Sequence, residues 1–242
     1  MNICILGATG NCGRRIVKGA IERGHAVTAL VRDSCQLQPQ DRLTIRTVSF
    51  EDPAQLADAM RGHNAVINSA GNISQGASYV PFVGRIIRAA EDALGAGGRF
   101  WLFGGAAALD VPGTNICTLD LPGVPKLFEA HRANLHVVRA STLDWSMLCP
   151  GPMIDAPDGK GSGGLLLSDE HWPVPRPKLT YFLPRIALSL AFKLAMPRMT
   201  VYYEDAACVI LDHLDQGRRF SHKRVGIALP RGEKRHKDDI PA

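Results

Sequence analysis

Several features that would place a protein in another class are missing from this sequence. Its six cysteines form no Cys-x-x-Cys pair, and no His-x-x-x-His pair accompanies them. Structural zinc sites depend on such closely spaced ligands. We therefore expect no bound metal, and we interpret the cysteines as free thiols in a reducing cytoplasm.

Signals for secretion or membrane insertion are also missing. Met1 is followed almost at once by the apolar run Ile3–Leu6, with no basic region before it, so we expect no signal peptide and a cytoplasmic protein. The most apolar stretch, 179–196, contains Pro184, Arg185 and Lys193, which argues against a membrane span, and we expect no membrane partner. This stretch is expected to form a surface-lying or lid helix, and its apolar side could equally be the face of a homodimer.

Charge of one sign is not in large excess. The net charge is +5, which suits a phosphate-bearing ligand but is too small to indicate a nucleic-acid partner. With 242 residues, 45% of them hydrophobic, the chain is long enough for one α/β domain with an extension on the substrate side. We expect one domain over 1–230, with a substrate lobe at about 151–200, followed by a charged, solvated tail over 231–242.

Short apolar runs alternate with segments of helical periodicity through most of the chain. This pattern predicts βαβ units, and hence a Rossmann-type doubly wound parallel sheet with helices on both faces. The segment 151–180 is rich in Gly and Pro and is expected to be a loop or an irregular lobe. The predicted strands are 3–6, 26–31, 43–50, 65–70, 99–103, 145–149 and 225–229, and the predicted helices are 11–23, 53–61, 80–94, 127–140 and 204–214.

A glycine-rich loop lies between the first predicted strand and the first predicted helix. It reads Gly7-Ala8-Thr9-Gly10-Asn11-Cys12-Gly13. Gly7 permits a tight turn out of the strand, Gly10 lets the backbone approach a pyrophosphate, and Gly13 lets the helix pack on the sheet. The first amides of the helix would bind the phosphates, with local contacts from Thr9, Asn11 and Cys12. The alternative is a glycine turn with a structural role alone.

The end of the second predicted strand bears on which dinucleotide is bound. NAD-specific Rossmann folds place an acidic residue there to bind the ribose hydroxyls. This chain has Arg32, and a guanidinium suits the 2′-phosphate of NADP. Asp33 follows directly and keeps NAD possible. An exposed charge at a strand end, without a ligand role, is the alternative for Arg32.

Two resemblances to known families rest on these and further residues. The Gly-x-x-Gly-x-x-Gly spacing resembles the short-chain dehydrogenase/reductase superfamily in its extended and atypical branches. The run Val-Arg-Asp-Ser at 31–34 and the segment from Ala130 to Pro152 resemble the atypical branch that contains biliverdin reductase B (flavin reductase) and NmrA-like proteins. The resemblance implies that Phe50 packs near the adenine, that Ala70 and Gly71 border the adenine ribose, and that Gly104 and Pro150 border the nicotinamide.

The usual catalytic pair of the superfamily, Tyr-x-x-x-Lys, is missing. The four tyrosines are followed four residues later by Val83, Arg185, Ala206 and Ala207. The flavin reductase's active-site serine would fall near Gly105, where no hydroxyl is present. His131 matches a histidine of that enzyme and is the best candidate acid, since an imidazole exchanges protons near neutral pH. The alternative is a histidine at a helix start or on the surface.

Three functions are compatible with this pattern. The first is an NADPH-dependent oxidoreductase that reduces a small carbonyl, quinone or flavin-like acceptor, because the cofactor supplies the hydride. The second is a non-catalytic, NmrA-like regulator that senses NADP, which the missing tyrosine, lysine and serine favour. The weakest is an epimerase or dehydratase, since such enzymes generally keep the Tyr-x-x-x-Lys pair.

Overall fold

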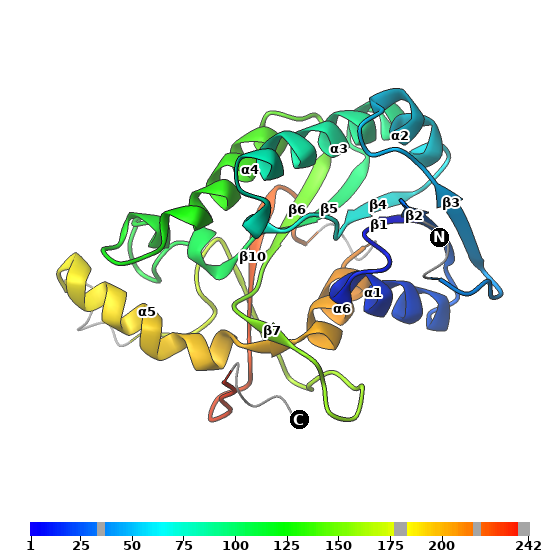
Figure 1. Ribbon diagram of the computed structural model, residues 1–242. Coiled ribbons are helices and arrows are strands. Elements are labelled where there is room, and N and C mark those ends of the chain that lie inside the picture. The colour runs from blue at the N-terminus through cyan, green and yellow to red at the C-terminus, as the bar shows by residue number, and fades with distance from the viewer. Residues whose placement is uncertain (33–36, 177–182, 215–218, 237–242) are drawn as a thin grey trace.

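The apolar runs of the sequence form one central sheet (Figure 1). The computed structural model describes residues 1–32, 37–176, 183–214 and 219–236. The sheet has eight strands in the order β3-β2-β1-β4-β5-β6-β10-β8, and all pairs are parallel except β10 with β8. The strands are β1 (Asn2–Leu6), β2 (Ala26–Val31), β3 (Leu43–Thr47), β4 (Ala65–Asn68), β5 (Arg99–Phe103), β6 (Asp144–Cys149), β8 (Leu166–Asp169) and β10 (Lys223–Ala228).

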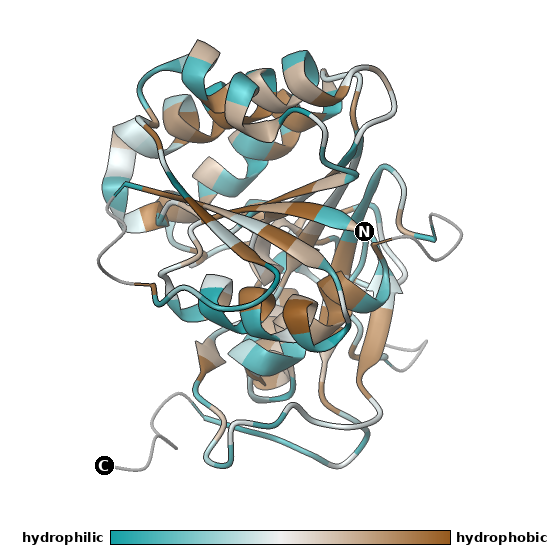
Figure 2. Ribbon diagram, turned by 90° about the vertical axis from the view of Figure 1, so that its right-hand side faces the viewer, coloured by the Kyte–Doolittle hydropathy of each residue, from teal (hydrophilic) through white to brown (hydrophobic). Residues whose placement is uncertain are grey.

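Helices cover both faces of the sheet, because alternate strand residues are apolar on both sides (Figures 1 and 2). Ile3 and Ile5 of β1 pack toward α1 (Asn11–Glu22) and α6 (Tyr203–Asp212). Cys4 and Leu6 of the same strand belong to the opposite core. That core lies under α2 (Pro53–Met60), α3 (Tyr79–Leu94) and α4 (Glu129–Arg139). The predicted doubly wound sheet is confirmed.

The strand order reverses direction between β1 and β4, since the chain passes from β1 to β2 and β3 on one side and from β4 to β5 and β6 on the other. Such a switch point leaves a crevice at the carboxyl ends of the strands, where α/β proteins bind ligands. The loop of residues 7–10 and residues 69–72 follow these two strands directly.

The largest differences from the sequence-based prediction lie after residue 150. The segment expected to be irregular contains β7 (Met153–Ile154) and β8. β7 pairs with β9 (Val201–Tyr202), and β8 is an edge strand antiparallel to β10. The apolar stretch near 179–196 forms α5 (Arg185–Met199), although residues 177–182 lie outside the described chain. In the first half, the strand expected over 43–50 ends at Thr47.

The prediction of a solvated tail is wrong at Arg235. Its guanidinium lies 3.7 Å from the ring centroid of Tyr202 and forms an ion pair at 3.4 Å with Asp205, which is fully buried. It also donates a hydrogen bond to the Ser162 hydroxyl. The tail is therefore attached to the start of α6. The rest of the expected tail from residue 237 onward lies outside the described residues.

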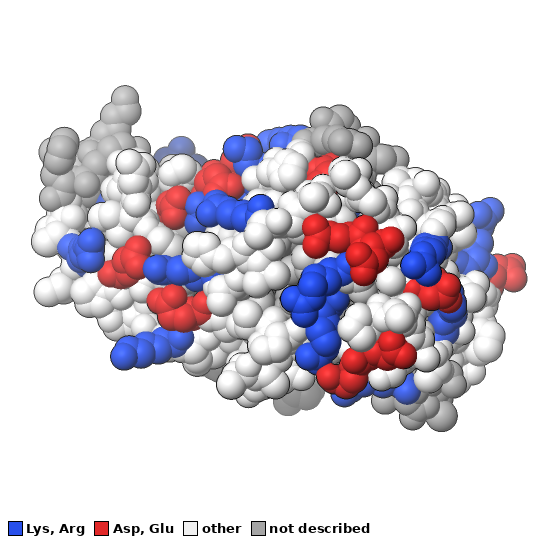
Figure 3. All heavy atoms as spheres, turned by 90° about the horizontal axis from the view of Figure 1, so that it is seen from above, with Lys and Arg blue, Asp and Glu red and all other residues white. Residues whose placement is uncertain are grey.

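Charged side chains of both signs share the outer face over α2, α3 and α4. Figure 3 shows Lys and Arg next to Asp and Glu across this face. Arg85 pairs with Glu51 at 2.6 Å, and Arg132 pairs with Asp120 at 2.7 Å. Within the described ranges, no helix has both the length and the apolar character needed to cross a membrane.

Candidate nucleotide and acceptor site

The amino end of α1 is open to an anion. Gly10 occupies the N-cap position, no side chain caps the helix, and its first turn contains no acidic residue. The first amides of the helix, at residues 11–13, and the positive end of the helix dipole are thus directed at the crevice. This is the arrangement that binds a pyrophosphate.

Gly7 and Gly13 are required by the geometry of the loop. Gly7 has a φ of +75°, and a Cβ there would lie 2.6 Å from the backbone of Ser69 and Ala70. A Cβ on Gly13 would lie 1.9 Å from the carbonyl oxygen of Gly7. At Gly10 the nearest atom, the Gly7 carbonyl oxygen, would be 3.3 Å away, so protein packing restricts a side chain there much less. These distances explain why Gly7 and Gly13 must be glycine, and the ligand role of Gly10 stays a prediction.

Two adjoining cavities of about 280 and 450 Å³ continue from the loop to the outer end of β2. Both are lined by Arg32, Phe50, Gln75 and Phe82. Arg32 is exposed, and within the described part of the chain it forms no ion pair. Asp33, the residue that kept NAD possible, lies outside the described residues. Of the candidate cofactor residues, the smaller cavity brings together Gly7, Thr9, Gly10, Arg32, Phe50, Ala70 and Gly71.

Phe50 is mostly buried, and its ring meets that of Phe82 edge-on with the centroids 5.9 Å apart. The two rings form an apolar wall beside Arg32. Such a wall suits a purine base, because the flat ring can pack on aromatic carbon while the guanidinium faces the ribose end. Phe50 is thus part of the core and also lines both cavities, and its contact with an adenine stays a prediction.

The side chains of Asn11 and Cys12 are directed at α6. The Asn11 amide lies 3.5 Å from the Tyr203 hydroxyl, and the Cys12 Sγ lies 3.9 Å from the Tyr203 carbonyl oxygen. Burial raises the pKa of the Cys12 thiol to about 12. Any contact of Cys12 with a phosphate would come from its backbone amide.

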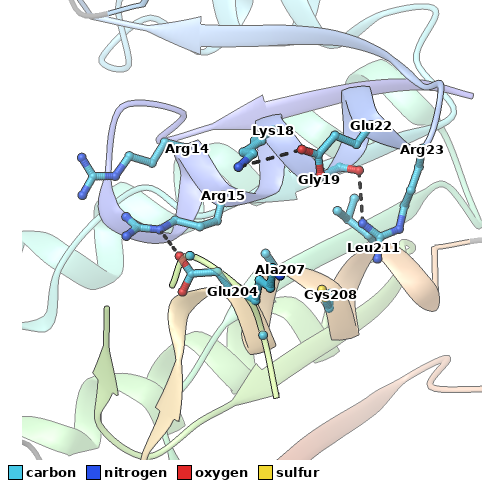
Figure 4. A pocket seen from close by; sticks show the side chains of 13 residues that line it. Arg14, Arg15, Lys18, Gly19, Glu22, Arg23, Glu204, Ala207, Cys208 and Leu211 are labelled. Atoms are coloured by element: carbon cyan, nitrogen blue, oxygen red, sulfur yellow. Dashed lines mark hydrogen bonds and ion pairs between the residues drawn. The ribbon is translucent and has the colours of Figure 1, made fainter. Parts of the chain in front are cut away.

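A further hollow of about 540 Å³ lies between α1 and α6 and does not include the glycine loop (Figure 4). Its cations are engaged with neighbouring groups. Arg15 pairs with Glu204 at 2.9 Å and also with Asp155, and Arg23 pairs with Asp212 of α6 at 2.8 Å. These contacts join α1 to α6 and to the 155–161 loop. We therefore interpret this hollow as a gap between packed elements and not as a ligand site.

The opposite end of the crevice is formed by residues that follow β5 and β6. A Cβ on Gly105 would lie 2.7 Å from Nε2 of His131, so the imidazole occupies the space beside the end of β5. A Cβ on Gly104 would instead meet the sulfur atoms of Met147 and Cys149 on β6. Gly104 is thus needed for packing against β6, which is a different reason from the nicotinamide contact that was expected. The Pro150 carbonyl accepts a hydrogen bond from the Ala106 amide at 2.8 Å and joins the two strand ends.

His131 is buried among aromatic rings. Its ring stacks on Phe128, with centroids 6.2 Å apart, and meets Tyr79 edge-on at 6.4 Å. Its exposed fraction is 8%, and burial lowers its pKa to about 4. The Nδ1 atom is buried without a hydrogen-bond partner in the described structure. The alternative of a surface histidine is wrong, and at pH 7 the imidazole is neutral.

An apolar cavity of about 320 Å³ adjoins this cluster. Phe128 lines it from the side of His131, and Met196 lines it from α5. The Met196 sulfur would lie 3.2 Å from a Cβ on Gly151, which follows Pro150. The cavity therefore lies between the 122–128 segment and α5, and its Phe128 and Met196 contact His131 and the Gly151 region. Its other lining residues are Pro122, Gly123, Val124, Pro125, Ser189, Phe192 and Lys193.

Sequence reasoning missed two polar residues near His131. Tyr79 is 5% exposed, and burial raises the pKa of its hydroxyl, an effect that the neighbouring Asn134 amide opposes. Asn134 is fully buried and lies three residues after His131, on the same face of α4. A buried amide on an otherwise apolar helix face was the available signal. Tyr79 could not be found in this way, because it begins a different helix.

The fold and this crevice define a Rossmann-type dinucleotide-binding protein. Residues 7–177 match the model of a family described as NAD(P)H-binding, which is more than half of the chain. The chain therefore belongs to this NAD(P)H-binding family. Among the described residues, no group of three or more His, Cys, Asp or Glu side chains is placed to hold a metal ion.

Three relatives illustrate the likeness. The uncharacterized protein YwnB of Bacillus subtilis is 31% identical over 170 residues, which cover 67% of this chain and 77% of YwnB. The crystal structure of SP1627, a candidate NADH-flavin reductase from Streptococcus pneumoniae TIGR4, is 25% identical, covers 95% of this chain and 100% of that one, and superposes with a TM-score of 0.71. A wide-type short-chain dehydrogenase/reductase of Veillonella parvula in complex with NADP is 17% identical, with a TM-score of 0.69 over 100% of this chain and 98% of that one. This last likeness shows the fold.

Proposed function

We propose that the protein is an NADPH-dependent oxidoreductase that passes hydride to a small, flat, apolar acceptor of the quinone, flavin or carbonyl type. One observation carries the proposal. The open glycine loop follows β1, and the Gly105–His131 contact follows β5, at the carboxyl edge of one parallel sheet. The apolar cavity of about 320 Å³ is lined by Phe128, whose ring stacks on His131. A nicotinamide held by the loop would point its reactive carbon toward that cavity.

Arg32 supports NADP over NAD in this proposal. It lines both cavities at the end of β2, and its exposed guanidinium has no carboxylate partner in the described ranges. A guanidinium binds a phosphate through paired, charge-assisted hydrogen bonds. The NADP in the Veillonella relative agrees with this choice. NAD, which lacks the 2′-phosphate, would gain nothing from this residue.

The acceptor would take its proton without a Tyr-x-x-x-Lys pair. His131 is neutral at pH 7, so it would act as a hydrogen-bonding group that orients the acceptor and not as a charged acid. Quinones and flavins accept a proton from water after hydride transfer, which removes the need for a strong acid. The name of SP1627, a candidate NADH-flavin reductase, supports a flavin among the acceptors to be tested.

A second candidate is a non-catalytic NADP sensor of the NmrA kind. Two observations favour it. Gly104 and Gly105 follow β5 where a residue with a hydroxyl group would be needed, and the pKa of His131 lies near 4. A site without an acid at neutral pH could bind the nucleotide and transmit its redox state only through conformation.

Titration of the purified protein with NADPH and with NADH, followed by acceptor assays on the same samples, tests the proposal. Quenching of fluorescence from Trp101, Trp145 and Trp172 would report binding. FMN, a soluble naphthoquinone and a small aromatic aldehyde would then be offered as acceptors. Tight NADPH binding with turnover is the expected result. Binding without turnover of any acceptor would favour the sensor, and no binding of either nucleotide would overturn both.

One pair of variants tests whether the apolar cavity holds the acceptor. Met196→Trp should fill the cavity and raise the acceptor KM by about tenfold or more, with the Kd for NADPH unchanged. Leu194→Trp is the matched control, because Leu194 is 69% exposed on the same helix. Equal KM values for the two variants would place the acceptor elsewhere.

A further inference from the structure

The outer face of α5 is apolar and uncovered. The face consists of Leu183, just before the helix, with Ile186, Leu190 and Leu194, which recur every fourth residue. Their exposed fractions are 38%, 75%, 58% and 69%. They are four of the six large hydrophobic residues that are exposed in the described chain. Exposed apolar side chains are thus concentrated on one helix, which marks an interaction surface.

The opposite face of the helix is apolar as well. Leu188, Phe192 and Ala195 are buried against the protein body. A helix that is apolar on both sides is normally covered on both sides. α5 lies at the edge of the molecule, where its first turns project beyond the central sheet (Figure 1). The rest of the described protein therefore buries the inner face of α5 and leaves its outer face exposed.

The exposed charged residues of α5 are both cations. Arg185 and Lys193 are exposed, and no aspartate or glutamate occurs between residues 171 and 203. A second copy of the chain placed on this face would bring the same cations to the contact and offer no carboxylate from α5 to pair with them. A partner surface that is both apolar and negatively charged would complement the apolar side chains and the cations of α5. An anionic lipid bilayer has this combination.

We propose that α5 lies flat in the headgroup boundary of an anionic membrane, with the side chains of its outer face in the acyl region. The helix has 15 residues and is about 22 Å long, too short to cross a bilayer but suited to lie along its surface. Arg185 and Lys193 bind lipid phosphates beside the apolar face. The sequence-based expectation of no membrane partner followed from the absence of a spanning segment, and surface binding requires none.

This docking does not depend on the reductase activity. One consequence does: the inner face of α5, with Phe192 and Met196, walls the acceptor cavity. A docked protein would hold that cavity at the lipid boundary, which favours acceptors dissolved in the bilayer. That consequence rests on the proposed function, whereas the docking is measured without cofactor or acceptor.

Co-sedimentation with vesicles tests the proposal. The full chain would be mixed with vesicles of phosphatidylcholine alone or with 30 mol% phosphatidylglycerol (about one charge in three lipids). We expect binding to the anionic vesicles that weakens at high salt, and little binding to the neutral ones. The variant Ile186→Gln/Leu190→Gln/Leu194→Gln should lose binding to both, because it removes the apolar contact.

Charge variants separate the two contributions. Arg185→Gln/Lys193→Gln should weaken binding to anionic vesicles by roughly fivefold per cation. Lys18→Gln/Lys160→Gln removes two exposed lysines on the α1 side and should leave binding unchanged. All variants change exposed positions, and unaltered circular dichroism and NADPH binding would establish that they are folded.

Two outcomes would overturn the proposal. Binding of the triple glutamine variant equal to that of the parent chain would remove α5 from the contact. Absence of vesicle binding, together with a dimer in light scattering that the triple variant converts to a monomer, would assign the face to a second copy of the chain.

Discussion

The proposed nucleotide side and the proposed acceptor side are built in different ways. On the nucleotide side, the turn of residues 7–10 and the first turn of α1 are contiguous in the chain, and their backbone amides are the groups proposed to bind the phosphates. On the acceptor side, His131 comes from α4, Tyr79 from α3, Met196 from α5 and Gly105 from the end of β5. The first site is local in the sequence, and the second is assembled from four distant segments.

The two sides would recognise their ligands through different kinds of group. A phosphate is recognised by backbone groups and a helix dipole, which nearly any side chain between the glycines permits. An acceptor is recognised by the shape of an apolar cavity, which depends on every side chain that lines it. The two sides should therefore respond independently to substitution, and the following changes test that separation.

Gly13→Ala should have the largest effect on the nucleotide side. The added Cβ would lie 1.9 Å from the Gly7 carbonyl oxygen, so the loop must open or the helix must move. We expect NADPH binding to weaken at least 100-fold and the free energy of unfolding to fall by about 1–3 kcal/mol. Gly163→Ala is the control, because a Cβ there meets no atom within 4 Å. Normal NADPH affinity in Gly13→Ala, measured by calorimetry, would contradict the backbone site.

His131 should make the stability of the acceptor side depend on pH. Its native pKa is lowered from 6.5 to about 4, so the unfolded chain binds this proton at a higher pH than the native protein does. Its contribution to stability is complete above about pH 6.5 and is lost as the pH falls toward 4. The loss amounts to about 2–3 kcal/mol at pH 4.5 relative to pH 7.5.

Urea unfolding at both pH values measures this effect. His131→Phe keeps an aromatic ring against Phe128 and should show a smaller loss of stability on acidification than the parent chain. His136→Phe is the matched control on the same helix, since His136 is exposed, and should behave as the parent chain does. The same pH dependence in all three proteins would exclude His131 as its source.

Arg32→Glu should act on the nucleotide side alone. A carboxylate in place of the guanidinium loses the hydrogen bonds to a 2′-phosphate and repels it, so the Kd for NADPH should rise by about 10- to 100-fold. The Kd for NADH should change by less than about threefold, since that cofactor has no phosphate there. Urea unfolding should be unchanged, because Arg32 is exposed. A parallel rise for both cofactors would show that Arg32 does not select NADP.

Arg235→Ala should have the smallest effect, and only on the substrate lobe. The change removes the ion pair at 3.4 Å with buried Asp205 and the cation over Tyr202. The carboxylate keeps the Tyr202 amide, at 2.9 Å, and the Ser162 hydroxyl as donors, so we expect a loss of about 1–2 kcal/mol. Exposed Lys234→Ala is the control.

Limited proteolysis measures the local effect of Arg235→Ala. Cleavage near residues 155–165 should be faster in this variant than in the parent chain or the control, while NADPH affinity stays the same. A change in NADPH affinity as large as the change in proteolysis would couple the two sides of the crevice.

Much of the nucleotide half could be predicted because its determinants are close together in the chain. The run Ile3–Leu6, the three glycines and the periodicity of α1 fall within about twenty residues, and each specifies a local conformation. The position of Arg32 at the carboxyl end of β2 could be predicted because it directly follows that strand. β8 could not be recognised, since four residues after a glycine-rich run become a strand only when β10 lies beside them.

The acceptor side shows the same limit at the level of single residues. His131 was recognised as a histidine near a helix start, but its neutral state comes from Phe128 and Tyr79 packing around it. Gly104 was assigned to the cofactor, although the sulfur atoms of Met147 and Cys149 are the neighbours that exclude a side chain there. The contacts of Tyr79 with His131 and of Gly104 with the two sulfur atoms join residues more than 40 positions apart.

The sequence by itself determined the α/β order, the phosphate loop and the cation at the end of β2, because backbone turns and hydrophobic periodicity act over a few residues. Only the tertiary structure decided that His131 is buried, that Tyr79 and Asn134 lie beside it, and that Arg235 is attached to α6. Desolvation and close packing depend on all atoms around a group. The chain brings those atoms from distant segments, so no local pattern records them.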